Sequence, residues 1–105
     1  MEIEEKSEGD VTTLFLKGRM VGGEGDKLLR EKVEGLVEEG RVNIVLDMAD
    51  VSYTDSLCLG EITRSQMTVS RKGGTLRLVN LNDRLRVLLT RTRLAWLEHT
   101  GDEGC

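Results

Sequence analysis

The stretch that decides the fold runs from residue 42 to residue 60 and reads VNIVLDMADVSYTDSLCLG. Its first part, residues 42–47, is a mostly apolar run rich in β-branched side chains, which is typical of a buried central strand. The strand is predicted to end at Asp47, and residues 51–55 are predicted to form a short extended or loop segment. A helix is then predicted over residues 56–72. A strand that leads into a helix in this way indicates an α/β domain.

The chain before this stretch shows the pattern of two strands and a helix. Residues 2–7 and 11–17 predict two short strands joined by a tight turn. Apolar side chains then recur at i, i+4, i+7 and i+8, which predicts a helix over about residues 26–39. Asp26 is a candidate N-cap of this helix. The first two strands therefore form a hairpin that adds an antiparallel edge to the sheet.

The chain after residue 72 continues the alternation of strand and helix. Residues 76–79 predict a strand, residues 83–91 a third helix, and residues 94–97 a last short strand or strap. Two strand–helix–strand units in this order imply parallel strands joined by right-handed crossovers. We expect one mixed sheet of four to five strands with an N-terminal hairpin and short helices packed mainly on one face. A single domain spans residues 1–105, with residues 100–105 as a frayed tail.

Length and charge exclude several classes of function. The chain has 105 residues, enough for one domain, and its 15 basic and 19 acidic side chains give a net charge of −4. An acidic chain lacks the clustered positive surface of a nucleic-acid binder. No run approaches the roughly 20 apolar residues of a membrane-spanning helix, so we expect no membrane insertion. The acidic N-terminus and the distant cysteines, Cys58 and Cys105, favour a cytoplasmic protein.

The side chains that carry chemistry are few. His99 is the one histidine, and two cysteines with one histidine are too few for an ordinary zinc site. Ser56 has no nearby general base, so a nucleophilic role is improbable. We expect no enzyme activity, no cofactor and no bound metal.

Charge is uneven along the chain. Residues 1–50 carry 7 basic and 13 acidic side chains, and residues 51–105 carry 8 basic and 6 acidic side chains. Four arginines cluster around the third helix: Arg84, Arg86, Arg91 and Arg93. The cluster is either a solvated helix face or a surface that faces a partner or an anion.

The start of the helix predicted from residue 56 offers two uses for Ser56. The first backbone N–H groups of a helix lack internal partners and concentrate positive partial charge. Ser56 can cap the helix through its hydroxyl, or it can carry a phosphate that this helix end stabilises. Asp55 is an equally good cap, which would leave the Ser56 hydroxyl exposed in the first turn. The spacing alone leaves these alternatives open.

Residues 47–60 resemble the signature of the STAS domain, which is found in bacterial anti-sigma factor antagonists and in the tails of sulphate transporters. The usual pattern is an apolar strand that ends in Asp, a short loop, and then Asp-Ser followed by a small residue and glycine. The resemblance extends to Gly18-Arg19 and to Gly73-Gly74 before the strand at residues 76–79. It implies the mixed sheet derived above.

The resemblance implies a regulatory function. In anti-sigma factor antagonists the serine after the aspartate is phosphorylated by an anti-sigma factor kinase with a histidine-kinase-like fold, and that position is Ser56 here. Phosphorylation releases the kinase, and a serine phosphatase of the metal-dependent type reverses it. The protein would thereby regulate sigma-factor-dependent transcription. Six residues are expected to contact the partner: Asp47, Asp50, Thr54, Asp55, Leu57 and Cys58. The alternative is a non-phosphorylated STAS subunit of a transport complex or signalling scaffold.

Leu57 and Cys58 depart from the family pattern, which has a small residue and a glycine at these positions. Leu57 is either exposed to a partner or turned into the core. A cysteine near a helix N-terminus can have a lowered thiol pKa, although a packed, inert thiol is far commoner.

Overall fold

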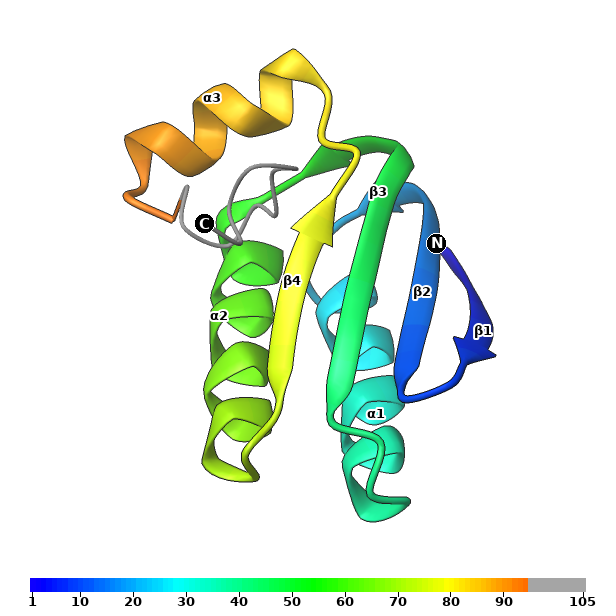
Figure 1. Ribbon diagram of the computed structural model, residues 1–105. Coiled ribbons are helices and arrows are strands. Elements are labelled where there is room, and N and C mark those ends of the chain that lie inside the picture. Colours follow the sequence, from blue (N-terminus) through cyan, green and yellow to red (C-terminus); the bar gives the residue numbers. More distant parts are fainter. Residues whose placement is uncertain (95–105) are drawn as a thin grey trace.

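The structure, a computed structural model, describes residues 1–94 as four strands and three helices (Figure 1). In chain order they are β1 (Glu2–Glu8), β2 (Val11–Met20), α1 (Gly25–Glu38), β3 (Asn43–Thr54), α2 (Ser56–Arg71), β4 (Thr75–Val79) and α3 (Asp83–Arg91). The predicted order is confirmed as far as α3. The last strand expected at residues 94–97 lies, apart from Leu94, outside the described residues.

The four strands form one mixed sheet in the order β1-β2-β3-β4. β1 pairs antiparallel with β2, whereas β2 with β3 and β3 with β4 are parallel. The predicted N-terminal hairpin and parallel crossovers are therefore confirmed. α1 and α2 lie side by side on one face of the sheet, while α3 lies beyond the end of β4 (Figure 1). No helix among residues 1–94 has the length and apolar character needed to cross a membrane.

The core lies between the sheet and the pair α1 and α2. Buried and partly exposed residues alternate over residues 43–48 of β3, which is the period of a strand with one covered face. Ile44 and Leu46 face the helices, while Val45 between them is only partly buried on the other face. The core side chains of the other elements include Leu14, Leu16, Leu29, Val33, Leu36, Ile62, Val69, Leu76 and Leu78. Burial of this set is the main favourable term in folding.

β3 is longer than the sequence predicts. The expected end at Asp47 is wrong, because the strand keeps pairing with β2 until Met20 lies opposite Thr54. Two shifts of register occur in this second half, and such irregularities bend and twist a strand. Figure 1 shows β3 bending over the top of the sheet towards α2. One residue, Asp55, separates the strand from the helix.

The start of α1 also differs from the prediction. The N-cap position is Glu24, whose side chain makes no capping bond, and Asp26 lies inside the first turn. The Asp26 carboxylate accepts a hydrogen bond from the Gly23 N–H at 2.7 Å. It therefore stabilises the glycine-rich turn before the helix rather than the helix end itself.

Candidate functional site

The first turn of α2 is capped by Asp55. Its backbone is extended (φ −116°, ψ 178°), and its Oδ1 accepts a hydrogen bond from the Cys58 N–H at 3.0 Å. This is the geometry of an N-cap residue. Of the two alternatives left open by the sequence, Asp55 is therefore the cap. Ser56 is the first residue of α2 and is exposed.

Asp55 also holds the loop between β2 and α1. Its second oxygen, Oδ2, accepts a hydrogen bond from the Gly22 N–H at 2.8 Å. The hydrogen bonds from Gly22 and Cys58 favour the ionised carboxylate, and they lower the pKa of Asp55 below its ordinary value. One carboxylate thus joins two segments that are far apart in the sequence.

Replacement of the Asp55 carboxylate should make the free energy of unfolding less sensitive to acidic pH. Because the pKa of Asp55 is lowered in the folded state, its contribution is complete above the unfolded pKa of about 3.9 and is lost as the pH falls through the folded pKa. Asp55→Asn should cost about 1 kcal/mol at pH 7. Urea unfolding at pH 7, 5 and 3 should show the difference between the two proteins shrinking as the pH falls. A difference that stays constant across this range would contradict the assignment.

Leu57 lies on the surface beside the same loop. It is 64% exposed, so of the two placements that the sequence allowed, the exposed one is found. A Cβ at Gly22 would come within 2.3 Å of the Leu57 Cδ1. Because Gly22 has no side chain, Leu57 can pack against this loop without a clash.

Cys58 points into the core and is inert. It is 0% exposed, and burial, together with the nearby Asp55 charge, raises the pKa of its thiol to about 12. The helix N-terminus would act in the opposite direction, but desolvation of the thiolate outweighs it. The suggestion of a lowered thiol pKa is wrong. The common interpretation, a small packed thiol, describes Cys58 here.

Thr54 is also buried, and its hydroxyl has no hydrogen-bond partner within residues 1–94. The side chains of both Thr54 and Cys58 are buried, and the expectation that they contact a partner stays a prediction. A buried hydroxyl without a partner is uncommon in folded proteins.

Asp47 and Asp50 lie earlier on β3 than the rest of the site. Asp47 accepts a hydrogen bond from Asn80 Nδ2 at 2.9 Å and one from the Ala49 N–H at 3.0 Å. It therefore ties β3 to the connection between β4 and α3. Asp50 is exposed, pairs with Lys17 across the parallel ladder, and adds to the negative charge that raises the pKa of Lys17, after the larger effect of Glu4.

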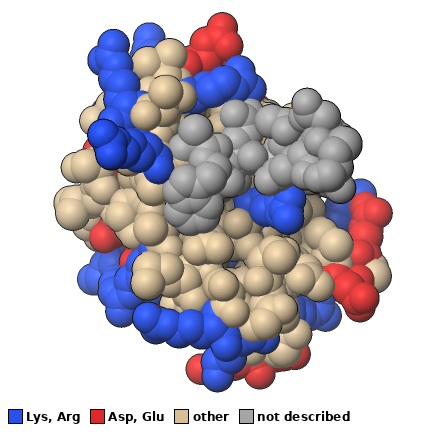
Figure 2. Space-filling model, turned by 60° about the vertical axis from the view of Figure 1, so that its left-hand side comes forward, with Lys and Arg blue, Asp and Glu red and all other residues tan. Residues whose placement is uncertain are grey.

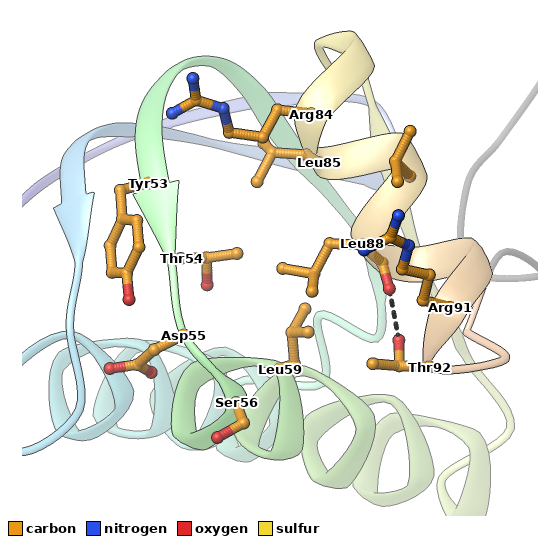
Figure 3. Close-up of a pocket in the computed structure, with 11 residues that line it drawn as sticks. Tyr53, Thr54, Asp55, Ser56, Leu59, Arg84, Leu85, Leu88, Arg91 and Thr92 are labelled. Atoms are coloured by element: carbon orange, nitrogen blue, oxygen red, sulfur yellow. Dashed lines mark hydrogen bonds between the residues drawn. The ribbon is translucent and has the colours of Figure 1, made fainter.

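A groove separates the start of α2 from α3. Its volume is about 520 Å³. Figure 3 shows Leu59 of α2 and Leu88 of α3 pointing towards each other across it, with Thr54 on the β3 side of this pair and Ser56 at the edge of the groove. We call this space the α2–α3 groove. Its lining residues are Tyr53, Thr54, Asp55, Ser56, Leu59, Arg84, Leu85, Val87, Leu88, Arg91 and Thr92.

The sequence did not indicate that α3 forms one wall of the site. The arginine cluster around residues 83–91 was the available signal, but its position relative to Ser56 depends on the path of the chain through β4. Tyr53 is a second residue that the prediction missed. The Arg19 guanidinium stacks over the Tyr53 ring at 4.7 Å from its centroid, a cation–π contact.

Comparison with known proteins places this geometry in a family. The family model described as the STAS domain matches residues 2–103. The chain belongs to the STAS domain family. The aspartate and the exposed serine at the start of α2 lie within the matched residues.

Individual relatives of this STAS domain include regulators of sigma factors. The anti-sigma-B factor antagonist of Bacillus subtilis is 41% identical over 58 residues, which are 55% of this chain and 52% of that protein. The chain thus spans about half the length of this curated relative. A crystal structure of a candidate anti-sigma factor antagonist from Thermotoga maritima is 26% identical, with a TM-score of 0.84 over 97% of this chain and 90% of that chain. The phosphorylated Bacillus cell fate determinant SpoIIAA, 16% identical, has a TM-score of 0.74 over 98% and 96%.

Proposed function

We propose that this STAS domain is an anti-sigma factor antagonist that phosphorylation at Ser56 switches off. The observation that carries the proposal is the position of Ser56. It is exposed at the first position of α2, and Asp55 does the capping, so the serine hydroxyl is not needed by the helix. The relatives named as anti-sigma factor antagonists support this role. The partner is an anti-sigma factor serine kinase, and a metal-dependent serine phosphatase restores the active form.

A phosphate at Ser56 changes the surface without disturbing the fold. It adds about −1.5 to −2 charges, and the N-terminus of α2 stabilises negative charge. Asp55, whose lowered pKa keeps it ionised, already lies next to it. A docked partner would meet two adjacent negative groups that must lose water in the interface. Release of the partner follows from repulsion and desolvation.

The partner contacts the exposed residues around this serine. In the proposed surface, Asp55 and Leu57 flank Ser56, and Leu57 offers an exposed apolar side chain. Asp50 extends the acidic part of the surface, and Asp47 acts through its bond to Asn80. Thr54 and Cys58 support the surface from inside the protein.

Substitution of Ser56 tests the proposal directly. Ser56→Asp should lower the affinity for the anti-sigma factor at least about tenfold, a loss of 1.4 kcal/mol, because it places a permanent charge at the docking surface. Ser56→Ala should bind like the unphosphorylated protein and should resist phosphorylation. Tagged forms of the three proteins serve as baits in host lysate, and mass spectrometry identifies what each retains. Incubation of the captured kinase with ATP should then modify Ser56 in the wild type.

The matched urea unfolding curves of the three baits show whether the substitutions leave the fold intact. Equal capture of an anti-sigma factor by wild type and Ser56→Asp would contradict the switch. Capture of transporter or scaffold subunits by all three baits would instead support the structural-subunit alternative. The departures at Leu57 and Cys58 are the features that favour this alternative.

A further inference from the structure

α3 presents a basic and apolar face to the α2–α3 groove. Arg84, Val87 and Arg91 all line the groove, and their i, i+3, i+7 spacing places them on one side of the helix. The two arginines are separated by about 10 Å along the helix axis. Val87 between them is half exposed. This pattern is complementary to a segment that has an apolar side chain between two acidic ones.

The two arginines at the groove have no acidic partner in the described part of the chain. Neither Arg84 nor Arg91 forms an ion pair within residues 1–94, whereas their neighbour Arg86 pairs with Asp83 at 3.3 Å. Figure 2 shows that lysine and arginine predominate on this face and that acidic side chains lie mainly towards its edges. The carboxylate that lines the groove, that of Asp55, is already engaged by the Gly22 and Cys58 N–H groups. Within residues 1–94, the charges of Arg84 and Arg91 are therefore not neutralised by an ion pair.

The floor of the groove provides a second, independent observation. The Thr54 side chain lies in the groove (Figure 3), and its hydroxyl is the buried side-chain oxygen or nitrogen atom within residues 1–94 that has no hydrogen-bond partner. A buried polar group without a partner destabilises the folded state. The base of the groove therefore contains a polar atom whose hydrogen bonding is not satisfied within the described residues.

We propose that the α2–α3 groove binds an acidic amphipathic helix of the partner protein. A leucine-like side chain of that helix enters the groove between Leu59 and Leu88, and carboxylates on either side of it meet Arg84 and Arg91. A helix in an apolar groove is a common mode of recognition. A flat lipid surface does not insert side chains into a groove, so the shape favours a protein helix. The inference rests on the proposed function and specifies the chemistry of the partner.

The position of Ser56 at the edge of the groove connects this occupant to the switch. A phosphate on Ser56 would lie beside the carboxylates of the bound helix. Like charges in a partly desolvated interface repel strongly, so an acidic occupant is released when the serine is modified. A basic occupant would be held more tightly by the same phosphate.

Binding of a defined peptide to the full chain tests the proposal. The probe is a fluorescein-labelled, end-blocked peptide of about four helical turns, with leucine at every third or fourth position, glutamate beside each leucine and alanine elsewhere. Its control carries lysine in place of each glutamate. Fluorescence anisotropy gives the affinities at low and physiological salt. Methyl NMR spectra identify whether Leu59, Leu85 and Leu88 are the side chains that sense the peptide.

The glutamate peptide should bind and should perturb these three leucines, whereas the lysine peptide should bind at least about tenfold more weakly. The double variant Arg84→Gln/Arg91→Gln should weaken the glutamate peptide about tenfold. The matched control, Arg71→Gln/Lys72→Gln, removes the same charge at the far end of α2 and should change the affinity less than about twofold. Ser56→Asp should weaken binding several-fold.

Several results would contradict the proposal that the groove binds an acidic helix. Equal losses in the two double variants would indicate attraction by net charge alone. Tighter binding of a peptide made of residues 95–105 of this chain, which contains Trp96, Leu97 and Glu98, would make the chain its own occupant. Preferential binding to vesicles of phosphatidylcholine and phosphatidylglycerol would assign the face to a membrane.

The experiments distinguish a failure of the proposed function from a failure of the proposed groove binding. If peptide binding is lost in Arg84→Gln/Arg91→Gln but unchanged in Ser56→Asp, the groove is the binding site for an acidic helix, and the proposed switch at Ser56 is wrong. If capture of an anti-sigma factor depends on Ser56 but is unchanged in Arg84→Gln/Arg91→Gln, the proposed function stands, and the proposal that the groove binds the partner is wrong.

Discussion

Ile44→Asp should abolish folding. Ile44 is 1% exposed in β3, and its strand neighbours on either side are Thr12 of β2 and Leu76 of β4, both also buried. The substitution loses about 2–5 kcal/mol of apolar packing and adds the cost of an unpaired charge in the core, at least several kcal/mol. The total is comparable to the whole stability of a domain, about 5–15 kcal/mol. Circular dichroism during urea titration should show no cooperative transition.

The adjacent residue provides the matched control. Val45 lies on the same strand but on the face that the helices do not cover, and it is partly exposed. Val45→Asp introduces the same charge without burying it, so the protein should still unfold cooperatively, with a loss of about 1 kcal/mol. A cooperative transition for Ile44→Asp near that of the wild type would show that β3 is not the central strand.

Gly74→Ala should have the second largest effect. The chain between α2 and β4 passes against the start of β3, and a Cβ at Gly74 would lie 2.0 Å from the Val42 carbonyl oxygen and 2.7 Å from its carbonyl carbon. That oxygen also accepts the Thr75 N–H at 2.8 Å, the bond that leads into β4. Because the obstacle is backbone, it cannot rotate away. The free energy of unfolding should fall by about 2–4 kcal/mol.

Gly60→Ala is the control for this glycine. Gly60 lies within α2, and a Cβ there would meet nothing within 4 Å. Alanine has a higher helix propensity than glycine, so the variant should gain up to about 1 kcal/mol. Urea midpoints measured for both variants separate the two cases. A Gly74→Ala protein as stable as Gly60→Ala would mean that the approach of this connection to Val42 is wrong.

Elements with a strong local signal were predicted well from the sequence. The helix predicted over residues 83–91 is α3, which Asn82 caps through a bond from the Leu85 N–H. The end of the predicted second helix agrees with α2 to within one residue, because the two glycines after it cannot extend a helix favourably. Periodicity and turn residues act over a few positions, and a single sequence displays them directly.

The features that the sequence did not predict depend on contacts between distant segments. β3 continues past Asp47 because β2 continues beside it as far as Met20, and no local pattern encodes that pairing. The inert thiol of Cys58 depends on burial, which overrides its position at a helix start. The second bond of Asp55 needs a backbone N–H from Gly22, which lies in another loop.

The residues of the candidate site likewise fall into those with a local sequence signal and those that depend on contacts between distant segments. Ser56 and Asp55 were found because both lie in one short motif at a helix start. Arg84 and Arg91 were noted only as part of a charged cluster, because their place on the groove that Ser56 also lines follows from the path of β4 and α3. The sequence thus indicated the position of the proposed switch, while the shape of the surface around it required the structure.

The two asparagines before α3 give β3 control over the width of the α2–α3 groove. Asn80 bonds to Asp47, and Asn82, which caps α3, also donates to the Val51 carbonyl oxygen at 3.4 Å. Both anchors are on β3, and the first of its two register shifts against β2 falls between them. The conformation of β3 therefore sets the position of α3, and with it the width of the groove. A substitution at Asp47, far from any bound partner, would alter recognition by moving a wall rather than by removing a contact.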